Sequence, residues 1–139
     1  MSGTPAARNN KILIVDGDFR SSQRLATLLG EDGYDVDVVR DASAAVVRLG
    51  RSPLPDVLIT ELKLPLGDGA ALARYARSQA SGVGIIVLTR YPNLFHQAAF
   101  GSAPLGVLTK PLDYPRLLEM LEGQRQSSEN GATAASPRI

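Results

Sequence analysis

The chain has 139 residues, a formal net charge of +1, 44% hydrophobic residues and 21% charged residues, which suits one globular domain with a single core. This near-neutral charge predicts no attraction to nucleic acid or to an anionic membrane. Because the chain has no cysteine and a single histidine, His96, the sequence excludes disulfides, thiolate catalysis and a multi-histidine metal site within one chain.

The N-terminal residues and the lengths of the apolar runs bear on where the protein resides. The first ten residues, MSGTPAARNN, are small and polar and lack the apolar core of a secretory signal. No stretch approaches the ~18 consecutive apolar residues that a membrane-spanning helix needs. We therefore expect a cytoplasmic protein without a membrane partner, and a flexible N-terminus over residues 1–10.

Two strands and two helices are predicted in the first part of the folded region. KILIV (11–15) is a continuous apolar run typical of a buried strand, and FRSSQRLATLLGEDG (19–33) carries leucines at helical spacing. YDVDVV (34–39) alternates polar and apolar residues, which predicts a strand with one solvated face. Residues 41–52 predict a short helix in which Asp41 is the N-cap.

Three strands and three helices are predicted in the remainder of the chain. Continuous aliphatic runs predict the strands, at residues 55–62, 83–89 and 106–110. The predicted helices cover residues 67–80, with Asp68 suited to an N-cap, residues 93–103, which form the weakest pattern, and residues 113–126. The last segment, residues 127–139, is rich in Ser, Gly, Ala and Asn, which predicts a disordered tail.

The predicted order is therefore five strands that alternate with five helices. Several of the strands are apolar on both faces, which indicates a parallel sheet covered by helices on both sides. The predicted fold class is α/β, a doubly wound five-stranded parallel sheet in one domain over residues 11–126.

Polar residues follow the predicted strands at the edge where such sheets bind ligands, beyond the carboxyl ends of the strands. These residues are Asp16 and Asp18 after the first strand, Glu61 after the third, Thr89 and Arg90 after the fourth, and Lys110 after the fifth. We expect these three acids, one hydroxyl and two cations to converge in one pocket.

Four stretches, ILIVDGD, PDVLITELKLPLGDG, IIVLT and GVLTKP, resemble the receiver domain of bacterial two-component response regulators in order and near-family spacing, over residues 11–123. The resemblance implies the flavodoxin-like receiver fold with strand order 2-1-3-4-5, a role in phosphorelay signal transduction, and a Lys110–Pro111 bond that can be cis. Another flavodoxin-like or nucleotide-binding domain is the alternative, but no GxGxxG or GxxxxGK[ST] phosphate loop is present.

In the receiver family, an Asp at the end of the third strand accepts a phosphoryl group from a histidine kinase. Two acids after the first strand hold Mg²⁺, a Ser or Thr after the fourth strand binds the phosphoryl oxygens, and a Lys pairs with the phosphorylated Asp. Phosphoryl transfer needs this kind of positioning and charge neutralisation around a carboxylate nucleophile. The residues at these positions here are Asp16, Gly17, Asp18, Glu61, Thr89 and Lys110.

Two of these positions depart from the family pattern. The extra methylene of Glu61 moves the carboxylate outward by about 1.5 Å, and misplacing a reacting group by about 1 Å can cost ~100-fold in rate. Gly17 removes a carboxylate that usually binds the metal, so the remaining Asp16 and Asp18 predict weak or absent Mg²⁺ binding, with no functional metal site. Arg90 also stands where the family commonly keeps a small residue. We therefore expect no cofactor and no enzymatic activity.

The leading hypothesis is a stand-alone, atypical receiver, or pseudo-receiver, that acts as a phosphorylation-independent protein-interaction module. Glu61 is then either a neutral relic held by Lys110 or a mimic of the phosphorylated state bound by Thr89 and Lys110. The alternatives are a functional phosphoacceptor in a histidine-kinase phosphorelay and a small-ligand-binding module that uses the same pocket.

A partner-binding face is implied by the resemblance, because receivers signal through their fourth helix, fifth strand and fifth helix. The residues expected on this face are Leu94, Phe95, Val107, Leu112 and Tyr114. The same face offers a contact for a homodimer.

Overall fold

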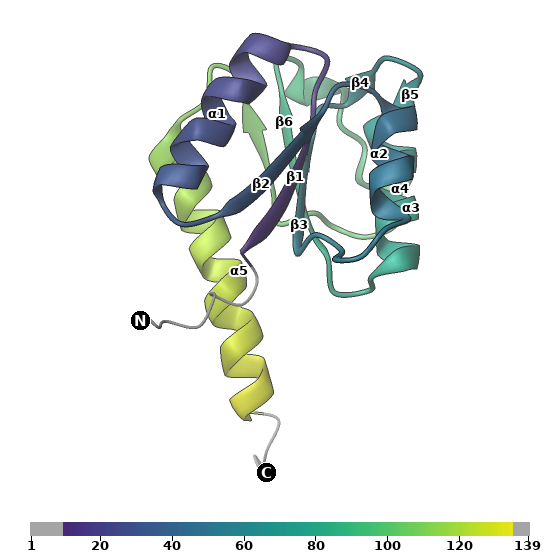
Figure 1. The fold of residues 1–139 in the computed structure, drawn as a ribbon. Coiled ribbons are helices and arrows are strands. Elements are labelled where there is room, and N and C mark those ends of the chain that lie inside the picture. The colour runs from purple at the N-terminus through teal and green to yellow at the C-terminus, as the bar shows by residue number, and fades with distance from the viewer. Residues whose placement is uncertain (1–9, 135–139) are drawn as a thin grey trace.

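The computed structural model of the protein describes the backbone of residues 10–134 and the side chains of residues 10–126. The flexible N-terminus predicted for residues 1–10 lies outside this range except for Asn10, as does the end of the predicted tail, residues 135–139. Between these limits the chain forms a five-stranded parallel sheet with helices on both faces (Figure 1).

The sheet contains the five strands that the sequence patterns predict. They are β1 (Lys11–Val15), β2 (Asp35–Val39), β3 (Val57–Thr60), β6 (Gly84–Thr89) and β7 (Gly106–Thr109). Their order is β2-β1-β3-β6-β7, with parallel pairing throughout. This order confirms the predicted 2-1-3-4-5 arrangement once the two short strands between β3 and β6 are left out.

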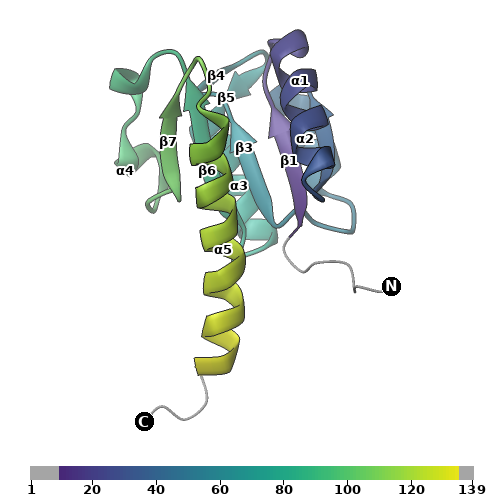
Figure 2. The same ribbon diagram turned by 90° about the vertical axis from the view of Figure 1, so that its left-hand side faces the viewer.

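The helices cover the two faces of the sheet as a doubly wound fold requires. They are α1 (Phe19–Glu31), α2 (Ala42–Leu49), α3 (Gly69–Gln79), α4 (Gln97–Phe100) and α5 (Tyr114–Ala134), with a 3-10 turn, η1 (Pro92–Leu94), before α4. Helices α1 and α5 lie on one face and α2, α3 and α4 on the other (Figure 1). In the rotated view α5 extends well beyond the edge of the sheet (Figure 2).

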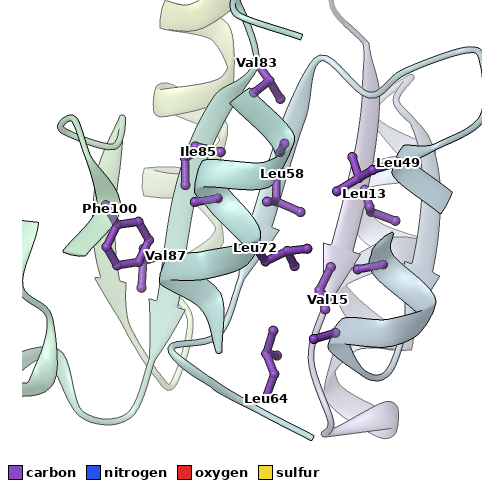
Figure 3. Packing of buried hydrophobic residues seen from close by; sticks show 14 of the residues in the cluster. Leu13, Val15, Leu49, Leu58, Leu64, Leu72, Val83, Ile85, Val87 and Phe100 are labelled. Atoms are coloured by element: carbon purple, nitrogen blue, oxygen red, sulfur yellow. The ribbon is translucent and has the colours of Figure 1, made fainter. Parts of the chain in front are cut away.

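Each face of the sheet carries its own apolar core. One core joins the sheet to α2, α3 and α4; Leu58, Leu72, Val87 and Phe100 lie in it (Figure 3). The other joins the sheet to α1 and α5, and Leu117 and Leu121 of α5 are fully buried there. Because β1, β3 and β6 contribute to both cores, their runs are continuously apolar and their carboxyl ends are held in fixed positions.

Three helices begin at an aspartate whose side chain caps the first turn. Asp18, Asp41 and Asp68 each accept a hydrogen bond from the backbone N–H three residues later, at 3.2, 2.7 and 2.8 Å. Such caps satisfy N–H groups that have no partner within the helix. The predicted caps Asp41 and Asp68 are confirmed, whereas Asp18 had been assigned to the pocket.

The helix predicted over residues 93–103 is reduced to two single turns, η1 and α4. Pro92 begins the first turn, and Gly101, with φ +82°, ends the second. Arg77 of α3 donates hydrogen bonds to the backbone oxygens of Phe100 and Ala103 at 2.7 and 3.2 Å. These side-chain donors satisfy carbonyls at and after the end of α4, which have no partner within the helix.

Two further differences from the predicted elements lie outside the main sheet. β4 (Lys63–Leu64) and β5 (Gly67–Asp68) form a short antiparallel hairpin, whereas the sequence predicted no strand over residues 63–66 and a helix from residue 67. Residues 127–134, assigned to a disordered tail, continue α5. Gln, Glu, Arg and Ala around this segment favour helix, and one glycine is a weak terminator. No helix in the described range is long and apolar enough to cross a membrane.

Candidate functional site

Three charged side chains from three strands meet at the carboxyl edge of the sheet. Asp16 follows β1, Glu61 follows β3 and Lys110 follows β7. The register of β1 and β3 pairs Val15 with Thr60, so the two acids that come next are neighbours. The side chains of Asp16, Glu61 and Lys110 are only 10%, 14% and 12% exposed. The predicted convergence of these three residues is therefore present.

We call these three residues the Lys110 triad. The ammonium Nζ of Lys110 lies 2.7 Å from Oδ2 of Asp16 and 3.2 Å from Oε1 of Glu61. The other two oxygens accept backbone N–H groups: Oδ1 of Asp16 from Asp18 at 2.9 Å, and Oε2 of Glu61 from Leu62 at 2.7 Å. All four carboxylate oxygens thus have a partner inside the domain. The two carboxylates are therefore held in place by contacts within the domain.

The electrostatics of the triad favour a charged Lys110. Burial alone would lower the pKa of the ammonium, but the hydrogen bond and the charge of Asp16, followed by the charge of Glu61, outweigh it and raise that pKa above its ordinary value of 10.5. One cation therefore sits between two anions at neutral pH. The Lys110–Pro111 peptide bond is cis, as the family resemblance allows.

The Mg²⁺ site that the resemblance implies does not fit the residues around the triad. Gly17 offers no ligand, and the carboxylate of Asp18 caps α1 by accepting the N–H of Ser21, a hydrogen bond that lowers the pKa of Asp18 below 3.8. A Cβ on Gly17 would lie 3.2 Å from Cγ of Pro65, so the space of an aspartate there is partly filled. Among residues 10–126, no group of three His, Asp or Glu side chains is arranged to hold a metal ion.

Thr89 and Arg90 lie at the site but make no bond to Glu61. Thr89 is fully buried, and its Oγ1 accepts the backbone N–H of Tyr91 at 3.1 Å. Over the described side chains, no hydrogen bond joins Thr89 to Glu61. Arg90 is exposed and borders the cavity beside the Lys110 triad. The hydroxyl of Thr89 therefore lies at the carboxyl end of β6, where it holds the turn that follows the strand.

A cavity of about 350 Å³ opens beside the triad, between the carboxyl edge of the sheet, α1 and the start of α5. Its polar lining includes the triad and Arg90, and its apolar lining includes Leu25, Leu28, Leu88 and Leu112. A volume of this size accommodates a small organic molecule. The arrangement is therefore chemically compatible with the small-ligand alternative, although it identifies no ligand.

Residues that fix the backbone of Glu61 were not predicted as part of the site. The N–H of Gly69 donates to the carbonyl oxygen of Leu62 at 2.8 Å, and the hydroxyl of Thr60 donates to the carbonyl oxygen of Glu61 at 2.9 Å. A Cβ on Gly69 would overlap that same carbonyl oxygen of Glu61. The available signal was a glycine directly after the N-cap Asp68, at a helix start where a helix former is ordinarily preferred.

The residues predicted for the interaction face surround the edge strand β7. Leu94 is 44% exposed, whereas Phe95, Val107, Leu112 and Tyr114 are half-buried. Phe95 and Val107 pack against the core of α2, α3 and α4, while Leu112 and Tyr114 pack against the core of α1 and α5.

Some of the surface around β7 differs from that expectation. The hydroxyl of Tyr114 donates to Asp32 at 2.8 Å. Burial, followed by this hydrogen bond, raises the pKa of Tyr114 above its ordinary value. The phenol is therefore engaged within the domain. Tyr91 and Leu105, which were not predicted for this face, are 57% and 41% exposed on the segments that lead into and out of α4.

Comparison with known proteins assigns the chain to one family. The family model for the response regulator receiver domain matches residues 12–122, and the chain belongs to this family. A response regulator receiver protein of Anaeromyxobacter sp. is 31% identical over 111 residues, covering 79% of this chain and 46% of that protein. The response regulator MprA of Mycobacterium bovis is 28% identical over 132 residues, covering 93% of this chain and 57% of that protein.

Solved structures agree with this assignment. A CheY-like receiver domain protein of Methanospirillum hungatei superposes with a TM-score of 0.78 at 23% identity, covering 86% of this chain and 96% of that one. The receiver domain of a sensor histidine kinase of Pseudomonas aeruginosa has a TM-score of 0.73 at 26% identity, covering 86% of this chain and 99% of that one. That structure has a magnesium ion coordinated in its active-site cleft. Receiver domains serve signal transduction, and this chain spans about half the length of the two curated relatives above.

Proposed function

We propose that this receiver domain signals through protein contacts without phosphorylation of Glu61. The observation that carries the proposal is the closed Lys110 triad, in which every carboxylate oxygen already has a partner. Gly17 supports it, because the position lacks a metal ligand and is packed against Pro65. A domain whose pocket carboxylates are already held by Lys110 and by backbone N–H groups does not depend on a phosphoryl group or Mg²⁺ to hold them in place. The cytoplasmic location expected from the sequence remains a prediction.

Within this proposal, the geometry favours Glu61 as a relic held by Lys110 over Glu61 as a mimic of the phosphorylated state. A mimic requires Thr89 and Lys110 to bind the carboxylate of Glu61 together. Lys110 does so, but no hydrogen bond joins the hydroxyl of Thr89 to Glu61 among the described side chains, and the second oxygen of Glu61 accepts the N–H of its own neighbour Leu62. Half of the required contacts are therefore absent from the described residues.

Treatment with a small-molecule phosphodonor and Mg²⁺ is expected to leave the intact mass of the protein unchanged. The displaced carboxylate and the missing ligand at Gly17 each impair in-line transfer, and a misplacement of about 1 Å alone can cost ~100-fold. A Mg²⁺-dependent gain of one phosphoryl group that disappears in Glu61→Gln would overturn the proposal in favour of a working phosphoacceptor. The Glu61→Asp variant is also expected to stay unmodified, because Gly17 remains.

The partner surface is the second element of the proposal, and we assign it to the face around α4, β7 and α5. Leu94 is its most exposed predicted aliphatic side chain. Replacing it in Leu94→Glu is expected to weaken binding of a natural partner by at least about tenfold, as loss of an apolar anchor does. Isothermal titration against a partner isolated from the native cell measures this, with an unchanged melting temperature as the control. Equal affinity of the variant and the natural chain would remove this face from the proposal.

A further inference from the structure

A groove lies on the face of the domain opposite α1 and α5, between α2, α3 and the β4–β5 hairpin. It has a volume of about 480 Å³, and its lining residues are Ala42, Ser43, Val46, Leu66, Gly67, Asp68, Ala71, Leu72 and Tyr75. We call this groove, together with the adjacent exposed Val47, the hairpin patch. The patch is separate from the Lys110 triad and from the face around β7.

The hairpin patch contains three of the large apolar side chains that the domain exposes. Leu66, Val47 and Val46 are 73%, 65% and 41% exposed. The exposed parts of these side chains gain nothing from the apolar core, because they stay in water in the isolated domain. Their exposed apolar area contributes favourable free energy only when a second surface covers it.

Leu66 adds an independent observation, because its backbone is left-handed. Its φ is +62°, and it is the only non-glycine residue of the described range with a positive φ. Bulky side chains rarely adopt this conformation, which glycine adopts without cost, and strained positions of this kind cluster at functional sites. The hairpin thus holds a leucine in a strained backbone conformation at a position where its side chain is mostly exposed.

The charge of the hairpin patch indicates which occupant suits it. Asp68 is the only Asp, Glu, Lys, Arg or His residue that lines the groove, and its carboxylate caps α3. Arg48, the only ionisable residue of α2, pairs with Asp37 of β2 at 2.8 Å. A surface that meets its own copy across a two-fold axis sets each charge near its equivalent, so a patch with few free charges is suited to such a contact.

We propose that the hairpin patch binds a second copy of this chain, with Leu66 of each copy entering the groove of the other. The contact is isologous, so the projecting leucine and the groove that receives it are supplied by both copies. It is distinct from the homodimer through the β7 face that the sequence suggested. It is also independent of any chemistry at Glu61, so phosphorylation of the protein would leave the inference standing.

Sedimentation velocity of the full chain over a micromolar concentration series tests the proposal. The natural chain is expected to show a concentration-dependent monomer–dimer equilibrium. Leu66→Gly is expected to raise the dissociation constant of the dimer at least about tenfold. Because glycine relieves the left-handed strain, the same variant is expected to keep or raise its melting temperature, an outcome that a purely structural leucine would not give.

Two variants complete the experiment. Val47→Asp places like charges in the contact and is expected to abolish the dimer, whereas Leu94→Glu, on the β7 face, is expected to leave it unchanged. A natural chain that stays monomeric across the series overturns the proposal and assigns the patch to a partner of another kind. A dimer that persists in both Leu66→Gly and Val47→Asp, or one that is lost in Leu94→Glu, overturns it as well.

Discussion

Replacing Lys110 with methionine is expected to lower the free energy of unfolding by about 3 kcal/mol. The change keeps most of the apolar stem but removes the charge that lies 2.7 Å from Asp16 and 3.2 Å from Glu61. Two carboxylates that are mostly buried are then left without a counter-charge, and breaking a buried pair in this way typically costs 3–5 kcal/mol, roughly the upper range of single substitutions. We take the lower end because the three side chains remain slightly exposed. Urea unfolding at neutral pH measures the difference.

Lys11→Met is the matched control for this prediction. Lys11 also pairs with an aspartate, Asp35, at 3.0 Å, but the two side chains are 36% and 63% exposed. An exposed pair contributes about 1 kcal/mol or less. Equal losses for Lys110→Met and Lys11→Met would contradict a special role for the buried triad. Adding Glu61→Gln to Lys110→Met is expected to recover part of the loss, because it removes one uncompensated charge.

The pH dependence of the difference follows from the pKa of Lys110. The folded state raises this pKa above 10.5, so the stabilisation by the ammonium is fully present below that value. It is lost as the pH rises through the higher pKa of the folded state. The difference between the natural chain and Lys110→Met should therefore stay constant from neutral pH to 10.5 and shrink at more alkaline pH.

Among the elements that were predicted correctly are strands whose pattern is dictated by burial on both sides of the sheet. The runs at residues 11–15 and 83–89 match β1 and β6 within one residue, and the order of the strands is as expected. Apolar side chains on both faces of a strand leave few alternative structures for such a run. The polar residues that follow the strands then meet at one edge because the sheet is parallel, which is why the convergence of Asp16, Glu61 and Lys110 was predictable.

The parts of the site that were not predicted depend on which hydrogen bond an individual side chain makes. Asp18, predicted for the pocket, borders the cavity, but its carboxylate also caps α1, and Thr89, which the mimic hypothesis pairs with Glu61, binds Tyr91. Either choice is compatible with the same residue types at the same spacing. The contacts of the shortened α4 have a similar origin, because the Arg77 side chain on α3, which donates to the carbonyl oxygens of Phe100 and Ala103, has no signature in residues 93–103.

At Leu66 the local sequence rules for turns fail, because a leucine adopts the left-handed backbone conformation. Turn rules favour glycine or asparagine for a positive φ, and Gly67 lies next to Leu66. A pattern-based prediction would have placed the glycine at the strained position. Departures from local consistency of this kind are expected mainly where function opposes stability.

Gly69→Ala is expected to be as disruptive as a change within the core, although it adds one methyl group. The new Cβ would overlap the carbonyl oxygen of Glu61 and approach Oγ1 of Thr60 to 3.2 Å. Because that carbonyl belongs to backbone held by the sheet, no flexible side chain can move aside. Overpacking of this kind typically costs about 1–3 kcal/mol, and we expect a loss of about 3 kcal/mol in the free energy of unfolding.

Gly30→Ala on α1 is the control with the opposite expected sign. A Cβ on Gly30 meets nothing within 4 Å, so alanine there should stabilise the helix by about 0.5–1 kcal/mol. The consequence for the site is tested by combining Gly69→Ala with Lys110→Met. If the methyl group displaces Glu61 from Lys110, the second substitution costs less in the Gly69→Ala background than in the natural chain. Fully additive losses would mean that Gly69 supports the fold but does not position Glu61 beside its cation.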